Sequence, residues 1–600
     1  IISPYEGPEE FYMSGRLIIE AWVKEYLQRD TVRLAFPIVF IIILVLFINF
    51  RSFRGIGLPL AIMLGGIIWT LGLMGVFNKT ITIVGVMLPT LILIISSSYS
   101  IHFLNQYYKD IFIDRSRKRN VENSILNIGK TILLAALTTI AGFAALTINK
   151  IVPMRELGIF VLIGVFFSMS LSLTFLPSVL TTMKKPRRKP QSVVQDSTIN
   201  TIFRNLGAVI IQKRKIILIA AILVAVWSAL GIKDIRVDTS WQRFFKEDSE
   251  ILKSQRYIKS NFGGVSTINV TFEIAKDRDL TFKDLEALNY VNQMQQWIKS
   301  QELFGPTTSL VDYIKRANQL LHGNNPEYYR MPQTQAQLLK ILMMFKMSEV
   351  SKSLGNVITD NYKNANVRVR ATKTDSMDVS ISRFKDFREK FHQYLDTHPF
   401  KGIEVKMSGV DLIYVSLVDY LVRSQLISIA LSVVIVFFII AYTFKSFLFG
   451  VCGLIPIIFG LLLNFGTMSY FHLSLDFITS MIASIAVGLG VDNSIHYLIR
   501  FTRTHKSAPL TERIKLALIH SGIPIFFTSF TLIAGFSVML FSSFKPILYF
   551  GVLISVTMLG CLIGVVLILP AFIYFSRPKA ILSKEEQIEY FNNAGNKNSR

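Results

Sequence analysis

The chain has 600 residues, of which 51% are hydrophobic and 17% are charged, a composition too apolar for an ordinary soluble protein of this length. A formal net charge of +24 raises the question of nucleic-acid binding. The basic residues, however, cluster beside apolar runs, which is the positive-inside pattern of membrane proteins. We therefore expect a membrane protein that binds no nucleic acid. Cys452 and Cys561 both lie in apolar runs, so neither a disulfide framework nor a metal site is expected.

The chain starts with a polar stretch, residues 1–31, which we interpret as the end of an external domain. Five apolar runs follow within residues 32–182, and this part is expected to be a first transmembrane block. Each run approaches the length of about 20 residues that a helix needs to cross the hydrocarbon core. The five spans are expected at about 32–50, 54–76, 82–106, 128–149 and 154–182.

A basic linker is expected at residues 183–215. It contains the run KKPRRKP (Lys184–Pro190) and an amphipathic segment, Thr198–Ile211, which is typical of a helix lying on a membrane surface. Because Lys and Arg gather in loops that stay in the cytoplasm, we place the linker there. Residues 216–232 form one more apolar span, which links the first block to the opposite side of the membrane.

Residues 233–420 are polar and are expected to form an extracytoplasmic domain. Within them, Ser266–Ile274 alternates apolar and polar residues, which predicts a half-buried strand. Leu280–Ser300 has the periodicity of a helix. The domain is therefore expected to be of the α+β class.

A second transmembrane block is expected at residues 421–576, followed by a cytoplasmic tail at 577–600. Its five spans are expected at about 425–443, 447–470, 477–501, 519–541 and 547–576. With the linking span, this gives about 11 spans in the chain.

The two transmembrane blocks repeat each other. Phe50–Phe53 (FRSF) recurs as Phe444–Phe447 (FKSF) at an offset of 394 (50 to 444), and Ala141–Phe143 (AGF) recurs as Ala534–Phe536 at an offset of 393 (141 to 534). One register with a single-residue slip indicates a duplication. Six spans, an even number, separate equivalent points, so we expect a parallel repeat with a pseudo-twofold axis along the membrane normal.

The repeat also predicts a part that the sequence lacks. The second block is preceded by a span and an external domain that start near Lys213, whereas only residues 1–31 precede the first block. We expect an N-terminal span and most of a first external domain, about 180 residues by the offset of the repeat, to be absent. The chain begins Ile-Ile-Ser, which indicates a processed chain or a fragment.

One span, an external α/β domain and five spans, all duplicated, resemble the RND superfamily of proton-driven exporters. Val237–Ile274 is similar to the start of its second porter domain, and Asn49–Leu60 and GLGVDNSIHYLIRF (Gly488–Phe501) also match. The details look most like the MMPL branch of hydrophobe and lipid transporters, which is related to Patched and sterol-sensing-domain proteins. The resemblance implies a polytopic α-helical membrane protein with a ferredoxin-like βαβ porter domain. Multidrug RND pumps carry larger external domains and paired core acids with a lysine, which this sequence lacks.

Asp492 is an acid deep within an apolar span. It lies about 15 residues into that span, some 22 Å from its outer end at 1.5 Å per residue. A charge at this depth costs about 2.5–3.5 kcal/mol, which indicates that it is retained for a reason. Since burial favours the neutral form of a carboxyl group, Asp492 is a candidate proton carrier. The alternative is a neutral, hydrogen-bonded packing residue.

The offset of 394 makes Ser98 the equivalent of Asp492, and Tyr99 the equivalent of Asn493. The MMPL resemblance implies an Asp-Tyr pair in each copy, with each acid facing the tyrosine of the other copy. The acid survives only in the second copy here and the tyrosine only in the first, so we expect one composite pair, Asp492 with Tyr99. The other pair is lost, which puts a two-acid relay, and with it full proton coupling, in doubt.

Further residues are candidates for the same site. His496 follows Asp492 by four residues on one helical face, where it is either a proton relay or a histidine that snorkels to the interface, and His102 has the same ambiguity. Glycines are expected to allow close helix approach around the acid, and hydroxyls are candidate relay members, although ordinary helix-to-helix or backbone bonding is the favoured interpretation of the threonines. The glycines are Gly488 and Gly490, and the hydroxyl residues are Thr528, Thr531, Thr138 and Ser98.

No nucleotide-binding loop, metal cluster or nucleophile constellation is found in the sequence, so we expect no cofactor and no enzyme. The leading hypothesis is proton-driven export of a lipid or other hydrophobic substrate, with protons and membrane lipids as the further partners. The alternative is a non-transporting, lipid-responsive sensor or assembly partner of the sterol-sensing-domain type. An accessory to protein secretion fits poorly, because such subunits carry different loop signatures. We expect a bacterial inner membrane with a periplasmic porter domain, and leave a homo-oligomer or accessory envelope proteins open.

Overall fold

The structure is a computed structural model that describes ten stretches of the chain. They are residues 10–111, 116–184, 197–238, 241–262, 267–275, 278–301, 304–348, 353–371, 377–504 and 508–576. The expected tail at 577–600 and most of the KKPRRKP run lie outside these residues. By packing, the chain divides into two compact units, Ile1–Trp22 with Asp238–Tyr420, and Val23–Val237 with Leu421–Arg600.

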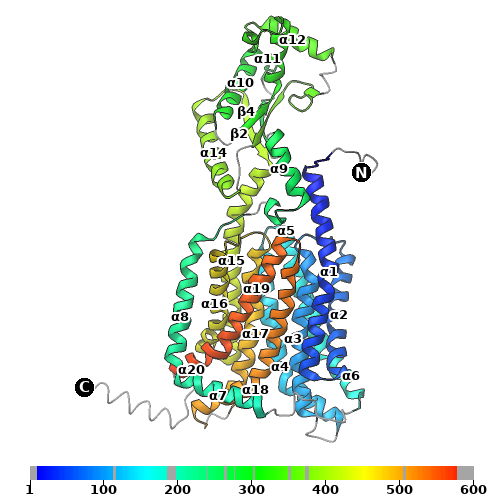
Figure 1. Cartoon of the computed structure of the whole chain (residues 1–600), viewed down its shortest axis with the longest axis vertical. Coiled ribbons are helices and arrows are strands. Elements are labelled where there is room, and N and C mark those ends of the chain that lie inside the picture. The colour runs from blue at the N-terminus through cyan, green and yellow to red at the C-terminus, as the bar shows by residue number, and fades with distance from the viewer. Residues whose placement is uncertain are drawn as a thin grey trace, which may run out of the picture. The chain divides into compact units, whose positions relative to one another are not determined.

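The larger unit is a bundle of long, roughly parallel helices (Figure 1). In the described stretches, 11 helical spans are long and apolar enough to cross a membrane. A bilayer offers no water to unpaired backbone groups, which is why helices form here. The helices are α1 (Arg16–Phe50), α2 (Phe53–Val76), α3 (Leu88–Asp110), α4 (Arg117–Ala144), α5 (Val152–Leu173), α6 (Phe175–Thr182), α7 (Ser197–Gln212), α8 (Arg214–Leu230), α15 (Val410–Phe444), α16 (Phe447–Tyr470), α17 (Ile482–Arg503), α18 (Leu510–Ser537), α19 (Lys545–Ile563) and α20 (Leu569–Ser576).

The helix boundaries confirm the internal repeat. Both ends of α1 and α2 recur at the offset of 394 as the ends of α15 and α16, and both ends of α4 recur at the offset of 393 as those of α18 (117 to 510 and 144 to 537). The connections repeat as well. Left-handed backbone, which is uncommon outside glycine, occurs at Arg51 (φ 44°) and its equivalent Lys445 (φ 49°), and again at Asn78 (φ 51°) and its equivalent His472 (φ 53°). The two copies therefore share their loop geometry as well as their helices.

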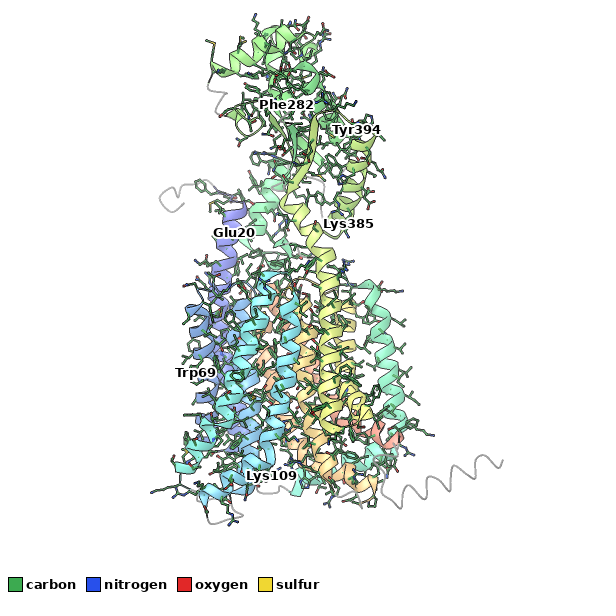
Figure 2. All side chains as sticks on the ribbon, turned by 180° about the vertical axis from the view of Figure 1, so that it is seen from behind. Glu20, Trp69, Lys109, Phe282, Lys385 and Tyr394 are labelled. Atoms are coloured by element: carbon green, nitrogen blue, oxygen red, sulfur yellow. The ribbon has the colours of Figure 1, made fainter. Side chains whose placement is uncertain are left out.

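Helices α3 and α17 form the centre of this bundle. In the most apolar 18-residue stretch of each span, 83% of α3 and 94% of α17 is buried. The buried share of the α8 span is 11%. These two are also the least hydropathic spans, because polar residues are tolerated at membrane depth only where they face protein. Outer helices expose apolar side chains instead, and Trp69 of α2 projects from the bundle surface (Figure 2).

The helix that contains the first expected span begins before that span. We expected the span at 32–50, and α1 begins at Arg16, so its first turns precede the expected span. Hydropathy gave no sign of these turns, because Glu20, Lys24 and most of the charges that follow lie on the exposed face of this part of the helix. Val23, Leu27, Asp30 and Leu34 are buried, and their spacing of three or four residues places them on one face.

The smaller unit is built around a four-stranded antiparallel sheet with the order β2-β3-β1-β4. Strand β1 alternates buried and half-buried residues, and in register Val270 lies opposite Val367 of β3 and Met407 of β4. The strands are β1 (Thr267–Ile274), β2 (Phe304–Thr308), β3 (Asn364–Ala371) and β4 (Ile403–Gly409), and the helices are α9 (Glu250–Phe262), α10 (Leu285–Ser300), α11 (Leu310–Leu321), α12 (Gln335–Lys346) and α14 (Met377–Thr397).

This unit has the split βαβ arrangement of ferredoxin-like domains. Strand β3 separates β1 from β2, and the two crossovers β1–α10–β2 and β3–α14–β4 are helical. The expected α+β class with βαβ units is therefore confirmed. The predicted helix starts later, at Leu285, because the carboxylate of Asp284 accepts the backbone N–H of Thr281 at 2.8 Å and holds the preceding residues in a turn.

Candidate functional site on the axis of the repeat

Three pairs of equivalent residues meet where α3 of the first copy faces α17 of the second. Ser98 contacts Asp492, His102 contacts His496, and Gln106 contacts Arg500, each pair being 394 residues apart in the sequence. A residue can contact its own equivalent only at the symmetry axis, so these contacts locate the pseudo-twofold axis. Within each helix the positions are four residues apart, about one turn, so the pairs form a continuous column. We call these six residues the axis ladder.

The first pair of the ladder holds the intramembrane acid. The Oγ atom of Ser98 donates to Oδ2 of Asp492 at 2.9 Å, and Asp492 is only 7% exposed. Its other oxygen, Oδ1, lies 3.2 Å from Nε2 of His496, one turn along the same helix. Asp492 is thus a buried acid with one hydroxyl donor and one imidazole neighbour.

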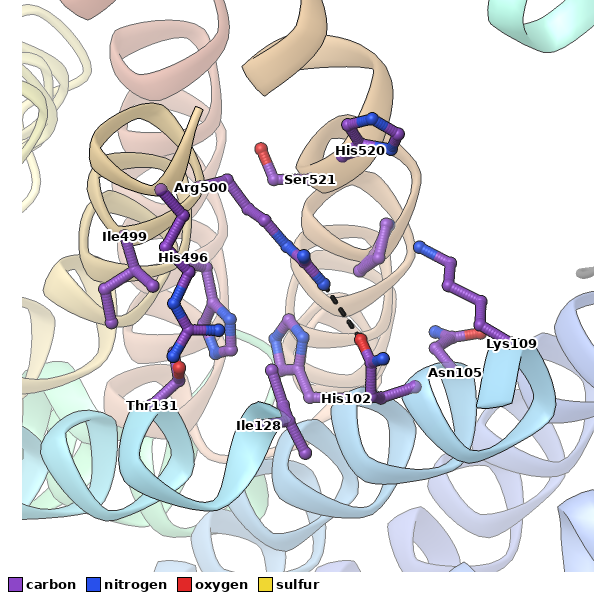
Figure 3. Close-up of a pocket in the computed structure, with 13 residues that line it drawn as sticks. His102, Asn105, Lys109, Ile128, Thr131, His496, Ile499, Arg500, His520 and Ser521 are labelled. Atoms are coloured by element: carbon purple, nitrogen blue, oxygen red, sulfur yellow. Dashed lines mark hydrogen bonds between the residues drawn. The ribbon is translucent and has the colours of Figure 1, made fainter. Parts of the chain in front are cut away.

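The second pair consists of two buried histidines in parallel contact. The rings of His102 and His496 stack with centroids 3.6 Å apart and an interplanar angle of 10° (Figure 3). Two imidazolium charges at this separation would repel by about 4 kcal/mol even at an effective dielectric constant of about 20. The contact therefore disfavours two positive charges on the pair at the same time.

The third pair ends the ladder with a fixed cation. Arg500 donates from Nη2 to Oε1 of Gln106 at 2.8 Å (Figure 3). The amide of Gln106 is itself oriented by Asp110, whose two carboxylate oxygens each accept from Nε2 at 3.0 Å. The guanidinium is thus held by a neutral partner that an acid fixes in place.

The composite pair expected from the repeat is not in hydrogen-bond contact. Tyr99 is buried, and in the described part of the chain no hydrogen bond joins its hydroxyl to Asp492. Ser98, one residue earlier on α3, occupies that position instead. Asn493, the equivalent of Tyr99, turns toward α18, where its Nδ2 donates to Oγ of Ser529 at 2.8 Å and its Oδ1 accepts from Thr528 at 3.3 Å.

The other candidate hydroxyls bond to their own helices. Thr138 donates to the carbonyl oxygens of Leu134 and Ala135, and Thr531 donates to that of Phe527 at 2.7 Å. This is ordinary bonding to carbonyls three or four residues earlier in the same helix, which needs no role in a relay. Thr528 makes the same kind of bond to Pro524 in addition to its contact with α17.

The two glycines before the acid lie at close helix contacts. A Cβ added at Gly142 of α4 would lie 2.5 Å from Cα of Gly488, so these two backbones touch directly. A Cβ at Gly490 would lie 2.6 Å from the sulfur of Cys561 on α19. Next to the first contact, Thr139 donates its hydroxyl across the repeat to the carbonyl of Gly488 at 3.1 Å. Small residues thus bring α17 against both α4 and α19.

A cavity continues the ladder toward the end of α3 and α17. It has about 30 Å³ of space for the centres of water-sized molecules, enough for about two waters. Its lining is symmetric, because twelve of its thirteen residues form six equivalent pairs. The pairs are His102/His496, Asn105/Ile499, Gln106/Arg500, Lys109/Arg503, Ile128/Ser521 and Thr131/Pro524. The cavity therefore lies on the same axis as the ladder.

The ladder also contains a donor set that could be read as a metal site. One ligand atom from each of His102, Asp492 and His496 lies within 4.8 Å of the others. An imidazole binds a metal in the plane of its ring at about 2.0–2.1 Å. The two ring planes are nearly parallel and 3.6 Å apart, so no single ion can lie in both planes. The stacked arrangement therefore does not fit a metal centre.

Comparison with known proteins identifies the family of the chain. The model of the MMPL family matches residues 8–226 and 244–589, which is most of the sequence. The chain belongs to the MMPL family. The resemblance expected from the sequence is thereby confirmed.

Relatives of this MMPL-family chain are distant in sequence. A protein of Methanocaldococcus jannaschii that is described only as a membrane protein is 21% identical over 368 residues, which are 60% of this chain and 90% of the relative. A similarly described protein of Streptomyces coelicolor is 23% identical over 44% of this chain and 38% of its own length. Among solved structures, the hedgehog release protein Disp of the water bear Hypsibius dujardini superposes with a TM-score of 0.66 at 14% identity, covering 91% of this chain and 70% of that one. This likeness concerns the fold.

Sequence reasoning missed several residues of the MMPL-family core. Gln106 and Arg500 complete the ladder, and the offset of 394 that linked Ser98 to Asp492 would also have linked them. Asp30 is another buried acid in a membrane helix, 1% exposed, which accepts the backbone N–H of Ser543 at 2.9 Å. It was missed because the first span was expected to start only at residue 32.

Proposed function

We propose that this protein is a secondary active transporter that exports a lipid or other hydrophobic molecule and is driven by protons through Asp492. Membership of the MMPL family and the fold shared with Disp support a transporter-like role for hydrophobic substrates in a membrane. In this proposal the protein is not an enzyme. Its partners are the substrate, protons and the surrounding lipids.

The observation that carries the proposal is the continuity of polar groups along the axis. Asp492 lies 3.2 Å from His496, which stacks on His102, and both histidines line the cavity that continues toward Arg500. A carboxylate within hydrogen-bond distance of an imidazole can exchange a proton with it, and the imidazole can exchange that proton with water in the cavity that it lines. The Ser98 hydroxyl stabilises the ionised acid between transfers, because a hydrogen bond to a charged group is stronger than one to a neutral group.

The energy available to such a relay is sufficient for useful work. Moving one elementary charge through a potential of 100 mV supplies about 2.3 kcal/mol. With one acid in the ladder, each cycle carries one proton at this site. Export against a modest gradient is within that range.

The proposed orientation places residues 233–420 outside and the basic linker 183–215 inside, in a bacterial inner membrane. Because Cys452 and Cys561 are buried, single cysteines introduced elsewhere report accessibility cleanly. Lys340→Cys on α12 should react with a membrane-impermeant maleimide in intact cells, and Arg204→Cys on α7 only after the cells are opened. Labelling of Arg204→Cys in intact cells would overturn this topology.

The test of the mechanism is Asp492→Asn in the full chain, reconstituted into vesicles with an imposed proton gradient. This change keeps the volume and removes the titrating group, so gradient-driven flux of a fluorescent lipid should fall to background while the protein remains folded. Asp30→Asn is the matched control, because it alters a second buried aspartate away from the ladder. Flux that is unchanged in Asp492→Asn would reject the proton-driven transporter.

One observation favours the alternative, a lipid-responsive sensor or assembly partner that does not transport. The position equivalent to the acid holds Ser98, so half of the expected acid set is missing. A sensor would bind the same fluorescent lipid in Asp492→Asn and in the unaltered chain, and neither would move it between leaflets or vesicles.

A further inference from the structure

The mouth of the axis cavity is surrounded by cations. Lys109 at the end of α3 and Arg500 and Arg503 near the end of α17 line it, with His520 of α18 beside them. Lys109, Arg503 and His520 are exposed, so the mouth reaches the surface of the bundle. Figure 3 shows Lys109, Arg500 and His520 around one space, contributed by three helices from both repeats.

No carboxylate forms an ion pair with these cations within the residues that the structure describes. Lys109, Arg500 and Arg503 have no carboxylate within 4.0 Å there. The neighbouring acid, Asp110, already accepts from Gln106, from Ser124 at 3.0 Å and from Asn127 at 3.4 Å. Asp110 partly offsets the charge of Lys109 and Arg500, but one acid beside three cations leaves the mouth positive, and this charge favours a bound anion.

The donors are held in place before any ligand arrives. Arg500 uses one nitrogen on Gln106, and Arg503 donates from Nη1 to the backbone carbonyl of Asn127 at 2.8 Å. Each guanidinium keeps further N–H groups for a ligand. Lys109 and Arg503 are equivalent positions of the repeat, so the two copies supply one cation each from opposite sides of the axis.

We propose that this cationic mouth is a binding site for a phosphate-type anion. Arginine pairs match the oxygens of phosphate through several parallel hydrogen bonds, and lysine adds a point charge. The cavity admits about the volume of two waters, so it accommodates phosphate oxygens while the rest of a ligand stays outside. Both a lipid headgroup at the bilayer boundary and free phosphate supply this chemistry, and basic pockets between membrane helices are suited to lipid phosphates.

The site is tested by binding to the purified full chain in uncharged detergent at physiological ionic strength. The probes are dioctanoyl phosphatidic acid, dioctanoyl phosphatidylcholine and inorganic phosphate, followed by native mass spectrometry and microscale thermophoresis. Arg500→Gln, Arg503→Gln and Lys109→Gln should each weaken binding of the phosphatidic acid about tenfold, the effect of one charge-assisted hydrogen bond. Lys130→Gln is the matched control, because Lys130 is an exposed cation of α4 outside the cavity lining.

Each result has one meaning. Binding of phosphatidic acid that depends on the three cations supports the site. Competition by inorganic phosphate then shows that the free ion suffices as a ligand, and no competition shows that binding needs the lipid. Equal affinity in the three variants and in Lys130→Gln, or no binding of either anion, overturns the site. Lys109→Gln removes a side chain with no ion pair in the described structure, so it tests the site even where an arginine variant does not fold.

The proposal stands apart from transport. Asp492→Asn should bind the anion as the unaltered chain does. Loss of flux in that variant with retained binding would separate the two sites.

Discussion

The two copies of the repeat have nearly the same backbone but different chemistry on the axis. Their helices and left-handed connections coincide at the two offsets of the repeat, and each copy supplies one histidine to the ladder. The first copy, however, contributes the neutral Ser98 and Gln106, whereas the second contributes the charged Asp492 and Arg500. The difference shows that helix packing sets the scaffold, while the charge at each level of the axis depends on single residues that can change independently.

The largest effect is expected when the acid is moved from the second copy to the first. Asp492→Ser alone should reduce proton-driven flux to background. The double variant Ser98→Asp with Asp492→Ser should recover more than about a tenth of it, a barrier cost under about 1.4 kcal/mol, because the acid again faces a hydroxyl and precedes a histidine by one turn. The readout is lipid flux in vesicles. A double variant as inactive as the single one would show that the axis is not functionally symmetric.

A second test compares equivalent glycines. At Gly142 an added Cβ meets the backbone of Gly488 at 2.5 Å, whereas at its equivalent Gly535 the nearest atom is the side-chain Cδ1 of Ile94, at 3.0 Å. A side chain can rotate away from an added methyl group, whereas backbone cannot. Gly142→Ala should therefore lower the free energy of unfolding by about 1–3 kcal/mol, and Gly535→Ala by clearly less. Thermal unfolding in detergent measures both. Similar losses would mean that α4 and α18 pack alike.

A third test compares two equivalent links between the copies. Asp30 of α1 accepts from Ser542 and from the N–H groups of Ser543 and Phe544, whereas on the other side Asn149 donates to Ser424 of α15 at 3.3 Å. Asp30→Ala leaves several buried donors without a partner and should cost about 1–3 kcal/mol, and Asn149→Ala about 0.5–1.5 kcal/mol. The same unfolding assay ranks them. A reversed order would contradict the assignment of Asp30 as the stronger link.

The smallest effect is expected at neighbouring positions of α3. Ser98 bonds to Asp492 and Tyr99 does not in this structure, so Ser98→Ala should slow proton-driven flux more than Tyr99→Phe. For Tyr99→Phe we expect a loss under about tenfold, since at most one net hydrogen bond of about 0.5–1.5 kcal/mol is removed. Initial rates in the vesicle assay resolve the two. A greater loss in Tyr99→Phe would place the tyrosine next to the acid in another state of the cycle.

Much of the fold followed from sequence because its signals are long and redundant. The apolar runs, the basic loops and one register across both blocks gave the repeat, and the alternation in Ser266–Ile274 gave a strand whose described part is Thr267–Ile274. The helical turns of α1 before residue 32 were not predicted, for a physical reason. Apart from the buried Asp30, the described charges of its first turns lie on the exposed face, and a hydropathy window averages over both faces.

The site was harder to predict because it depends on the rotation of helices about their own axes. Each residue turns an α-helix by about 100°, so whether Ser98 or Tyr99 meets Asp492 is decided by a rotation of that size. An amphipathic helix reveals its rotation in the sequence, but α3 and α17 are buried on nearly all sides, so a contrast between a buried and an exposed face gives no guide to their rotation. Only the packing of the two copies against each other determines the rotation of α3 and α17.

The contact between Ser98 and Asp492 also requires the two halves of the bundle to differ in sequence. In a twofold dimer of identical chains, a residue on the axis meets its own twin. Two second-copy halves would set one carboxylate against another and one guanidinium against another, and two first-copy halves would have neither charge. One acid opposite one serine requires two unlike halves. Fusion of the halves into one polypeptide ensures that they are always made together, in equal number, and with the correct partner.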